Sequence, residues 1–179
     1  MSDPKEKCEV VFEKEDAYKS LELTNSWIGN IDTKASFLLA YLSVIMGFVV
    51  SHGFPAIFSV ETVAPVGFSY WAKIICVVAL YLSLVLAVTL LLGTLTARIN
   101  GQSSKPSLLF FGEISKLSLN DYKAKILNRT EDELIKDILK QIHTNAEICA
   151  KKSKIYNAGV KVTLLGTVLY VVCMILRAL

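Results

Sequence analysis

The sequence lacks the residue patterns on which most enzymes and metal proteins depend. It has only two histidines, His52 and His143, and it contains no GxSxG, HExxH or phosphate-binding-loop motif. The four cysteines show no CxxC spacing, and two of them lie in apolar segments. Buried thiols explain them better than a zinc site or a disulfide framework. We therefore expect a protein that is not an enzyme and holds no metal or cofactor.

The sequence also lacks a large excess of positive over negative charge. The net charge is only +3 and no dense Lys/Arg tract occurs, which argues against nucleic acid as the main partner. Hydrophobic residues make up 53% of the chain, above the roughly 45–50% of an ordinary soluble domain. The excess is concentrated in three blocks, as in membrane proteins. The N-terminal segment carries too many charges for the apolar core of a cleavable signal peptide.

The three blocks predict an all-α membrane protein with three transmembrane helices, since a bilayer core about 30 Å thick needs about 20 helical residues. The predicted segments are an amphipathic helix at 1–34, spans at 35–54, 74–95 and 158–177, a loop at 55–73 and a polar helical region at 96–157. The third span is short, because its uncharged stretch covers only residues 162–176 unless Lys161 and Arg177 extend outward. A buried core helix is the alternative for this segment.

The distribution of Lys and Arg predicts the orientation of the chain. The loop at 55–73 holds none before Lys73, whereas the N-terminal segment and the polar helical region hold many. Positively charged segments stay in the cytoplasm. We therefore expect a cytoplasmic N-terminus, a cytoplasmic region at 96–157 and an external first loop.

Polar residues interrupt the apolar stripes of two predicted helices. Asn25 and Asp32 interrupt the stripe of the N-terminal helix. Asn145 and Lys152 interrupt the stripe of a helix that opens with a capping-box sequence at 130–133. Burying such a group unpaired costs roughly 1–3 kcal/mol when it is neutral, and more when it is charged. Two explanations fit: the groups pair with one another, for example Asp32 with Lys152, or they face a ligand.

A small anionic nucleotide suits the second explanation. A lysine would meet its phosphate, an asparagine amide would bond to its base edge, and an aromatic ring would stack on the base. The candidate ligand-binding residues are Asn25, Trp27, Asp32, Lys34, Phe110, Phe111, Asn145, Lys152 and Tyr156. Anchoring at the membrane interface is the alternative role for Trp27, and packing against the helices is the alternative for Phe110 and Phe111.

Three markers in order give the chain a resemblance to a known family. The sequence NSWIGNIDTKAS at 25–36 precedes the first span, PSLLFFGEI lies at 106–114, and a helix carrying Asn145, Lys152 and Tyr156 leads to the last span. This arrangement resembles the transmembrane effectors of Pycsar, a bacterial pyrimidine-cyclase system for antiphage resistance. The resemblance covers nearly the whole chain, roughly residues 15–177.

The resemblance implies a function that composition and periodicity do not. Such effectors are similar in sensing a cyclic pyrimidine mononucleotide, cCMP or cUMP, the product of a partner pyrimidine cyclase. They then impair the bacterial inner membrane, which gives abortive infection. Three spans cannot enclose a pore alone, so we expect a homo-oligomer in the active state, with Gly47, Gly93 and Gly166 permitting close helix contacts. The alternatives are a ligand-independent structural membrane subunit and a constitutive holin-like toxin.

Overall fold

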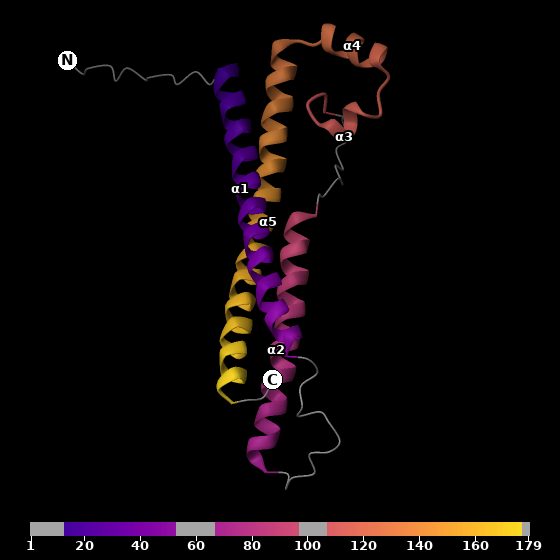
Figure 1. The fold of residues 1–179 in the computed structure, drawn as a ribbon. Helices are drawn as coiled ribbons and strands as arrows, with labels where there is room; N and C mark the ends of the chain where they lie inside the picture. The colour runs from indigo at the N-terminus through magenta and orange to yellow at the C-terminus, as the bar shows by residue number, and fades with distance from the viewer. Residues whose placement is uncertain (1–12, 53–66, 97–106, 177–179) are drawn as a thin grey trace, which may run out of the picture. The chain divides into compact units, whose positions relative to one another are not determined.

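The computed structural model describes residues 13–52, 67–96 and 107–176, and every regular element within those ranges is an α-helix. The helices are α1 (Lys14–Ser51), α2 (Phe68–Leu95), α3 (Phe111–Ile114), α4 (Leu119–Leu127) and α5 (Glu131–Ile175) (Figure 1). The prediction of an all-α fold is confirmed. Residues 1–12, most of the loop predicted at 55–73 and the start of the polar region lie outside the described residues.

Local side-chain hydrogen bonds fix where α4 and α5 begin. The Ser118 hydroxyl accepts a hydrogen bond from the Asp121 backbone N–H at 3.2 Å. Thr130 Oγ1 accepts from the Glu133 N–H at 3.3 Å, while Glu133 Oε2 accepts from the Thr130 N–H at 3.2 Å. This reciprocal pair is a capping box, which satisfies backbone donors that a helix start otherwise leaves unpaired. The capping box predicted at residues 130–133 is confirmed.

Three of the helices are long and apolar enough to cross a membrane, namely α1, α2 and α5. Large apolar side chains point away from the protein: Phe37 is 74% exposed, and Ile75 and Leu164 are each 65% exposed. So many large exposed apolar side chains are rare on soluble proteins but are solvated by lipid chains in a bilayer. The predicted membrane protein with three candidate spans is therefore confirmed in the length and composition of its helices.

The chain divides into two compact units. The first, which we call the polar unit, comprises Met1–Trp27 and Arg98–Ile148, and the second, the apolar unit, comprises Ile28–Ala97 and Cys149–Leu179. The helices α1 and α5 each contribute residues to both units, while α3 and α4 belong to the polar unit and α2 to the apolar unit. The two units are described separately below.

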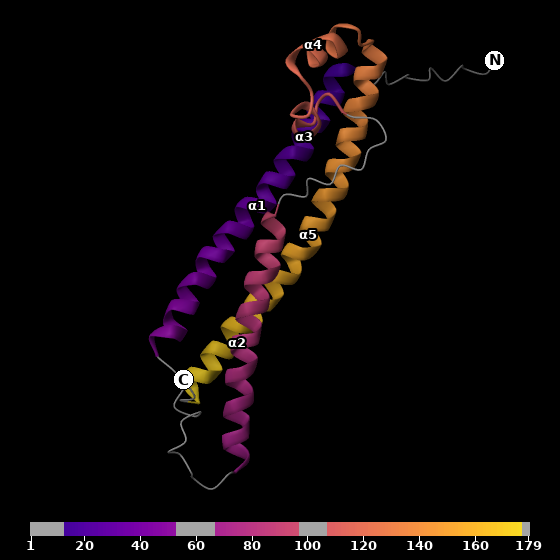
Figure 2. The same cartoon turned by 90° about the vertical axis from the view of Figure 1, so that its right-hand side faces the viewer.

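The apolar unit has one hydrophobic core shared by its three helices. In Figures 1 and 2 the second part of α1, α2 and the last part of α5 lie side by side. The buried residues of this core are Ala35, Leu42, Ile45, Val49, Val77, Leu80, Leu84, Ala87, Leu91 and Cys173. Around this core the Tyr41 and Thr167 hydroxyls join α1 to α5 at 3.1 Å. Side-chain packing therefore fixes how these helices meet.

Glycines allow α5 to approach α2 closely. A Cβ atom built on Gly159 would lie 2.9 Å from Leu91 Cδ2, and one on Gly166 would lie 3.0 Å from Ser83 Oγ. Within the described residues, nothing lies within 4 Å of such an atom on Gly47 or Gly93. Gly159 and Gly166 therefore permit close packing of α5 on α2 within one chain, whereas the Cβ positions of Gly47 and Gly93 face open space among the described residues. The expected contacts between copies at Gly47, Gly93 and Gly166 stay a prediction.

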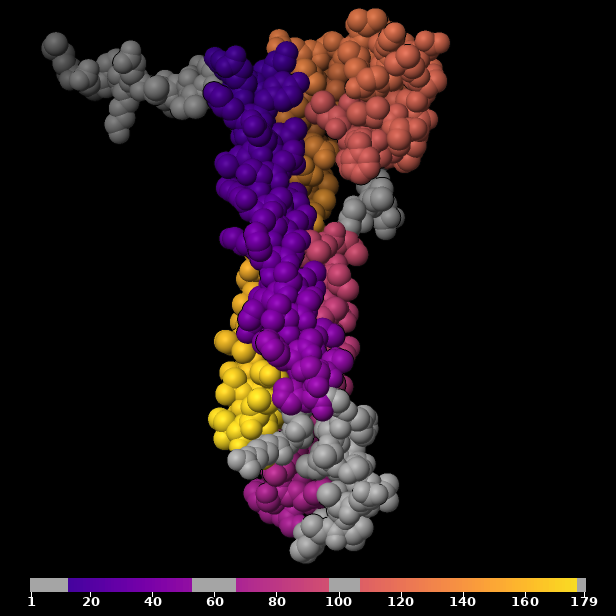
Figure 3. Space-filling view, viewed as in Figure 1, coloured from indigo at the N-terminus to yellow at the C-terminus, as the bar shows by residue number. Residues whose placement is uncertain are grey.

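The polar unit encloses little apolar surface. The hydrophobic side chains buried among its described residues are Ala17 and Ile138. Figure 3 shows the α3–α4 region gathered against the start of α5. Hydrogen bonds and ion pairs therefore hold the segments of the polar unit in place, as apolar packing does in the apolar unit.

Candidate functional site

The two polar interruptions in the polar unit bond to each other. Asn145 Nδ2 on α5 donates a hydrogen bond to Asn25 Oδ1 on α1 at 2.7 Å, across 120 positions of sequence. Asn145 Oδ1 accepts from Gln141 Nε2 at 3.1 Å. Asn145 is only 8% exposed. Its amide therefore has a partner for both its oxygen and its nitrogen, as a buried polar group requires.

The interruptions in the apolar unit form an ion pair. Lys152 Nζ lies 2.6 Å from Asp32 Oδ1 and 2.8 Å from Oδ2. The Lys152 side chain is 12% exposed and the Asp32 side chain 34%. A lysine buried to this extent needs a partner for its charge. The structure thus realises the first explanation drawn from the sequence, mutual pairing, in both units.

The remaining candidate residues are divided between the units. In the polar unit Trp27 is 52% exposed, and the Phe110 and Phe111 rings contact each other with centroids 4.9 Å apart. In the apolar unit Lys34 is exposed and Tyr156 packs against the hydrophobic core. As direct ligand contacts, all nine candidate residues stay a prediction.

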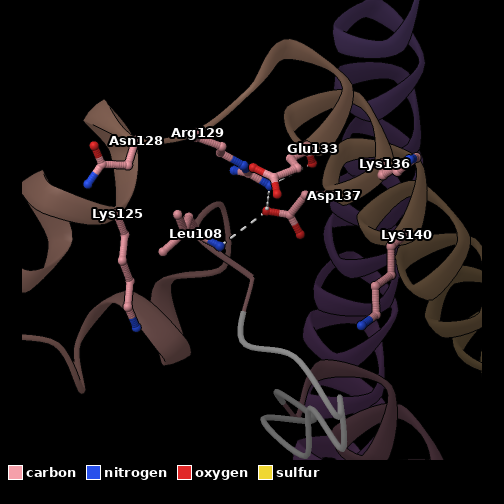
Figure 4. A pocket seen from close by; sticks show the side chains of 8 residues that line it. All are labelled: Leu108, Lys125, Asn128, Arg129, Glu133, Lys136, Asp137 and Lys140. Carbon is pink, nitrogen blue, oxygen red and sulfur yellow. Dashed lines mark hydrogen bonds and ion pairs between the residues drawn. The ribbon is translucent and has the colours of Figure 1, made fainter.

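A pocket that the sequence reasoning missed lies where α4 and the start of α5 meet. Its volume is about 470 Å³, and its lining residues are Leu108, Lys125, Asn128, Arg129, Glu133, Lys136, Asp137 and Lys140. Figure 4 shows Lys125 and Lys140 on opposite sides, with the Arg129–Asp137 pair and Leu108 between them. Four of the eight lining residues are cationic and two are anionic, so the pocket is basic.

A buried ion pair holds the walls of this pocket together. Arg129 Nη2 lies 2.7 Å from Asp137 Oδ2, and the two side chains are only 14% and 11% exposed. The same guanidinium nitrogen donates to the Glu133 carbonyl at 2.9 Å, and Asp137 Oδ2 also accepts from the Leu108 N–H at 3.1 Å. One carboxylate therefore joins the segment before α3, the segment before α5, and α5 itself.

The spacing of the pocket residues was visible in the sequence. Lys136, Asp137 and Lys140 follow Glu133 by three, four and seven positions, which places all four on one helix face. Such a mixed-charge face usually indicates solvent exposure. The contribution of α4 and of Leu108 depends on tertiary contacts that no local pattern encodes.

These features define a class of protein: an all-α membrane protein whose polar helical unit contains a basic pocket of ligand size. A family model described as the Pycsar effector protein domain matches residues 16–178, so the chain belongs to the Pycsar effector family of antiphage defence. The resemblance drawn from the sequence is confirmed.

Two curated relatives align along most of their own length. The chain is 29% identical to the Pycsar effector protein GmPycTM of Gulbenkiania mobilis over 89% of this chain and 90% of the relative. It is 25% identical to the Pycsar effector protein PtPycTM of Propioniciclava tarda over 88% of this chain and 77% of the relative. No solved structure matches the chain.

Proposed function

We propose that this protein is a membrane effector activated by a cyclic pyrimidine mononucleotide, cCMP or cUMP, that a partner pyrimidine cyclase makes. In its active state it impairs the bacterial inner membrane and ends the infection by abortive death or growth arrest of the cell. Membership in the Pycsar effector family supports this proposal, as do the three apolar helices. The protein acts by binding and rearrangement, without catalysis and without a metal or cofactor.

One observation carries the proposal: the helices that supply two of the three candidate spans also carry the polar pairs. In the polar unit α1 and α5 are joined by Asn25–Asn145, and in the apolar unit by Asp32–Lys152. Pairs of this kind have two discrete arrangements, closed and open. A nucleotide that binds the open arrangement more tightly shifts the protein toward it. Four of the sequence-based candidate residues, those that form the two pairs, then act as contacts that activation breaks.

The proposed topology places the sensor where the signal is made. The N-terminus and residues 96–157 face the cytoplasm, in agreement with the distribution of Lys and Arg. Because three helices cannot enclose a pore alone, the disruptive state is a homo-oligomer in the lipid bilayer.

Calorimetric titration and vesicle leakage test this function together. Detergent-purified protein is titrated with cCMP, cUMP and, as a control, cAMP, and the same protein is reconstituted into dye-loaded vesicles. We expect one pyrimidine nucleotide to bind and to trigger dye release. Leakage without nucleotide would favour the holin-like alternative, and neither binding nor leakage would favour the structural subunit.

A further inference from the structure

We infer that the basic pocket between α4 and α5 is the site that binds the cyclic nucleotide, with Lys125 at its phosphate, Asn128 at its base and Lys136 adding positive charge on the opposite side (Figure 4). This inference rests on the proposed function and identifies where on the protein the nucleotide binds. None of these three residues was among the candidates drawn from the sequence. The pocket lies wholly within the polar unit.

The size of the pocket suits a mononucleotide. Its volume of about 470 Å³ lies within the range of about 300–1,000 Å³ typical of small-molecule sites. Its walls come from the segment before α3, from α4 and from α5. A site enclosed by several segments can contact a ligand on more than one side, which a single helix face cannot do.

The charges of the pocket favour an anion. Arg129 and Asp137 compensate each other at 2.7 Å. The lining lysines Lys125 and Lys136 then outnumber the one other acidic residue, Glu133. The cyclic phosphodiester carries a single negative charge, and an ammonium group binds phosphate oxygens as a strong, charge-assisted donor. Within the described residues, neither Lys125 nor Lys136 has an ion-pair partner.

The pocket also offers a group that can read a pyrimidine edge. Asn128 lies at the C-terminal end of α4 and lines the pocket. Its side-chain amide both donates and accepts hydrogen bonds, which matches the mixed donors and acceptors of cytosine and uracil. Leu108 adds apolar surface for the face of the ring. Phosphate and base contacts are thus available in one cavity.

A second pocket in the same unit has the opposite charge balance, so the basic lining is not common to the pockets of this unit. That pocket, of about 380 Å³, is lined by Glu13, Lys14, Glu15, Glu131 and Ile135. Three carboxylates face one lysine there, and Lys14 is already 3.7 Å from Glu131. An anionic ligand would be repelled from this pocket, so the basic pocket is the better site of the two.

Substitution of the two lysines tests the assignment. We compare the Kd for cCMP and cUMP of the wild-type protein with that of Lys125→Gln, Lys136→Gln and the double variant in detergent. Loss of the charge-assisted bond from Lys125 should weaken binding by about tenfold, and loss of the Lys136 charge on the opposite side should weaken it less. The matched control is Lys123→Gln, which removes the same charge from the same helix two positions away, outside the pocket lining. It should leave the Kd unchanged.

A second variant separates a base contact from general electrostatics. Asn128→Asp keeps the size of the side chain but removes its donors, and carboxylates accept from the cytosine amino group. We expect it to change the ratio of the cCMP and cUMP dissociation constants. Thermal unfolding of every variant should match that of the wild type, because these side chains are exposed.

The outcomes distinguish the two levels of the proposal. A wild-type protein that binds neither nucleotide overturns the proposed function and this site with it. A wild-type protein that binds, with an unchanged Kd in the double variant, overturns the site alone. A lipid headgroup shares the phosphate chemistry, so association with phosphatidylglycerol and phosphatidylcholine vesicles is measured in parallel. If the double variant loses only phosphatidylglycerol binding, the pocket is a lipid site and the inference is wrong.

Discussion

The polar unit and the apolar unit are stabilised by different kinds of contact. The apolar unit buries a continuous cluster of side chains from three helices, with Leu42, Leu80 and Leu91 fully enclosed. The polar unit buries only Ala17 and Ile138 among its described hydrophobic residues and depends on bonds such as Arg129–Asp137. Packing tolerates the loss of one polar contact, whereas a network of a few ionic bonds does not. We therefore expect the polar unit to be the part that responds to a charged ligand.

The largest effect is expected when the Arg129–Asp137 pair is broken. Asp137→Ala leaves a guanidinium that is only 14% exposed without its carboxylate, a change that costs about 3–5 kcal/mol. Hydrogen exchange should accelerate in α3 and α4 and stay unchanged in α2. The control is the double variant Arg129→Met, Asp137→Leu, which removes both charges and should recover most of the protection. Equal exchange in α2 and α4 of Asp137→Ala would show that the two units are not independently stabilised.

The next effect tests packing in the apolar unit. Gly159→Leu places a side chain where a Cβ alone would lie 2.9 Å from Leu91, and overpacking of this kind costs about 1–3 kcal/mol. The melting temperature in detergent should fall. Gly93→Leu is the matched control, since no described atom lies within 4 Å of its Cβ position. A similar loss in both variants would mean that helix propensity or lipid contact, rather than α2–α5 packing, is being measured.

A smaller effect is expected at the ion pair of the apolar unit. Asp32→Asn removes the charge that faces Lys152 at 2.6 Å. Since Asp32 is 34% exposed, solvent screens part of the interaction, and we expect a loss of about 1–2 kcal/mol. Under the proposed function, the variant should release dye from vesicles at lower nucleotide concentration. Asp16→Asn, an exposed acidic position on α1, is the control; an equal response there would remove any special role for the pair.

The smallest effect is expected at the amide pair of the polar unit. A neutral hydrogen bond contributes about 1 kcal/mol, so Asn25→Ala and Asn145→Ala should each lower stability modestly. A double-mutant cycle of unfolding free energies should give a coupling energy of about that size. A coupling energy near zero would show that the 2.7 Å contact of these two side chains does not stabilise the unit.

The features that the sequence predicted depend on local rules or on strong patterns. The capping box needs only Thr130 and Glu133 three positions apart. The pairing of Asp32 with Lys152 was one of the two explanations that the sequence left open, because each charge interrupts an apolar stripe and needs either a partner or a ligand. The pocket was missed because its shape depends on the bond from the Leu108 N–H to Asp137 across 29 positions. A backbone donor leaves no trace in the amino-acid sequence, so its partner cannot be read from a pattern.

Cys149 gives this protein a built-in reporter. Its thiol is free and half-buried, and it lies on α5 between Asn145 and Lys152. The thiols of Cys76 and Cys173 are also free and sit in the hydrophobic surroundings of α2 and the end of α5. In a Cys8→Ser background, a water-soluble maleimide should therefore modify Cys149 first. The modification rate then reports how accessible this position on α5 is with and without nucleotide, and mass spectrometry reads it without any added probe site.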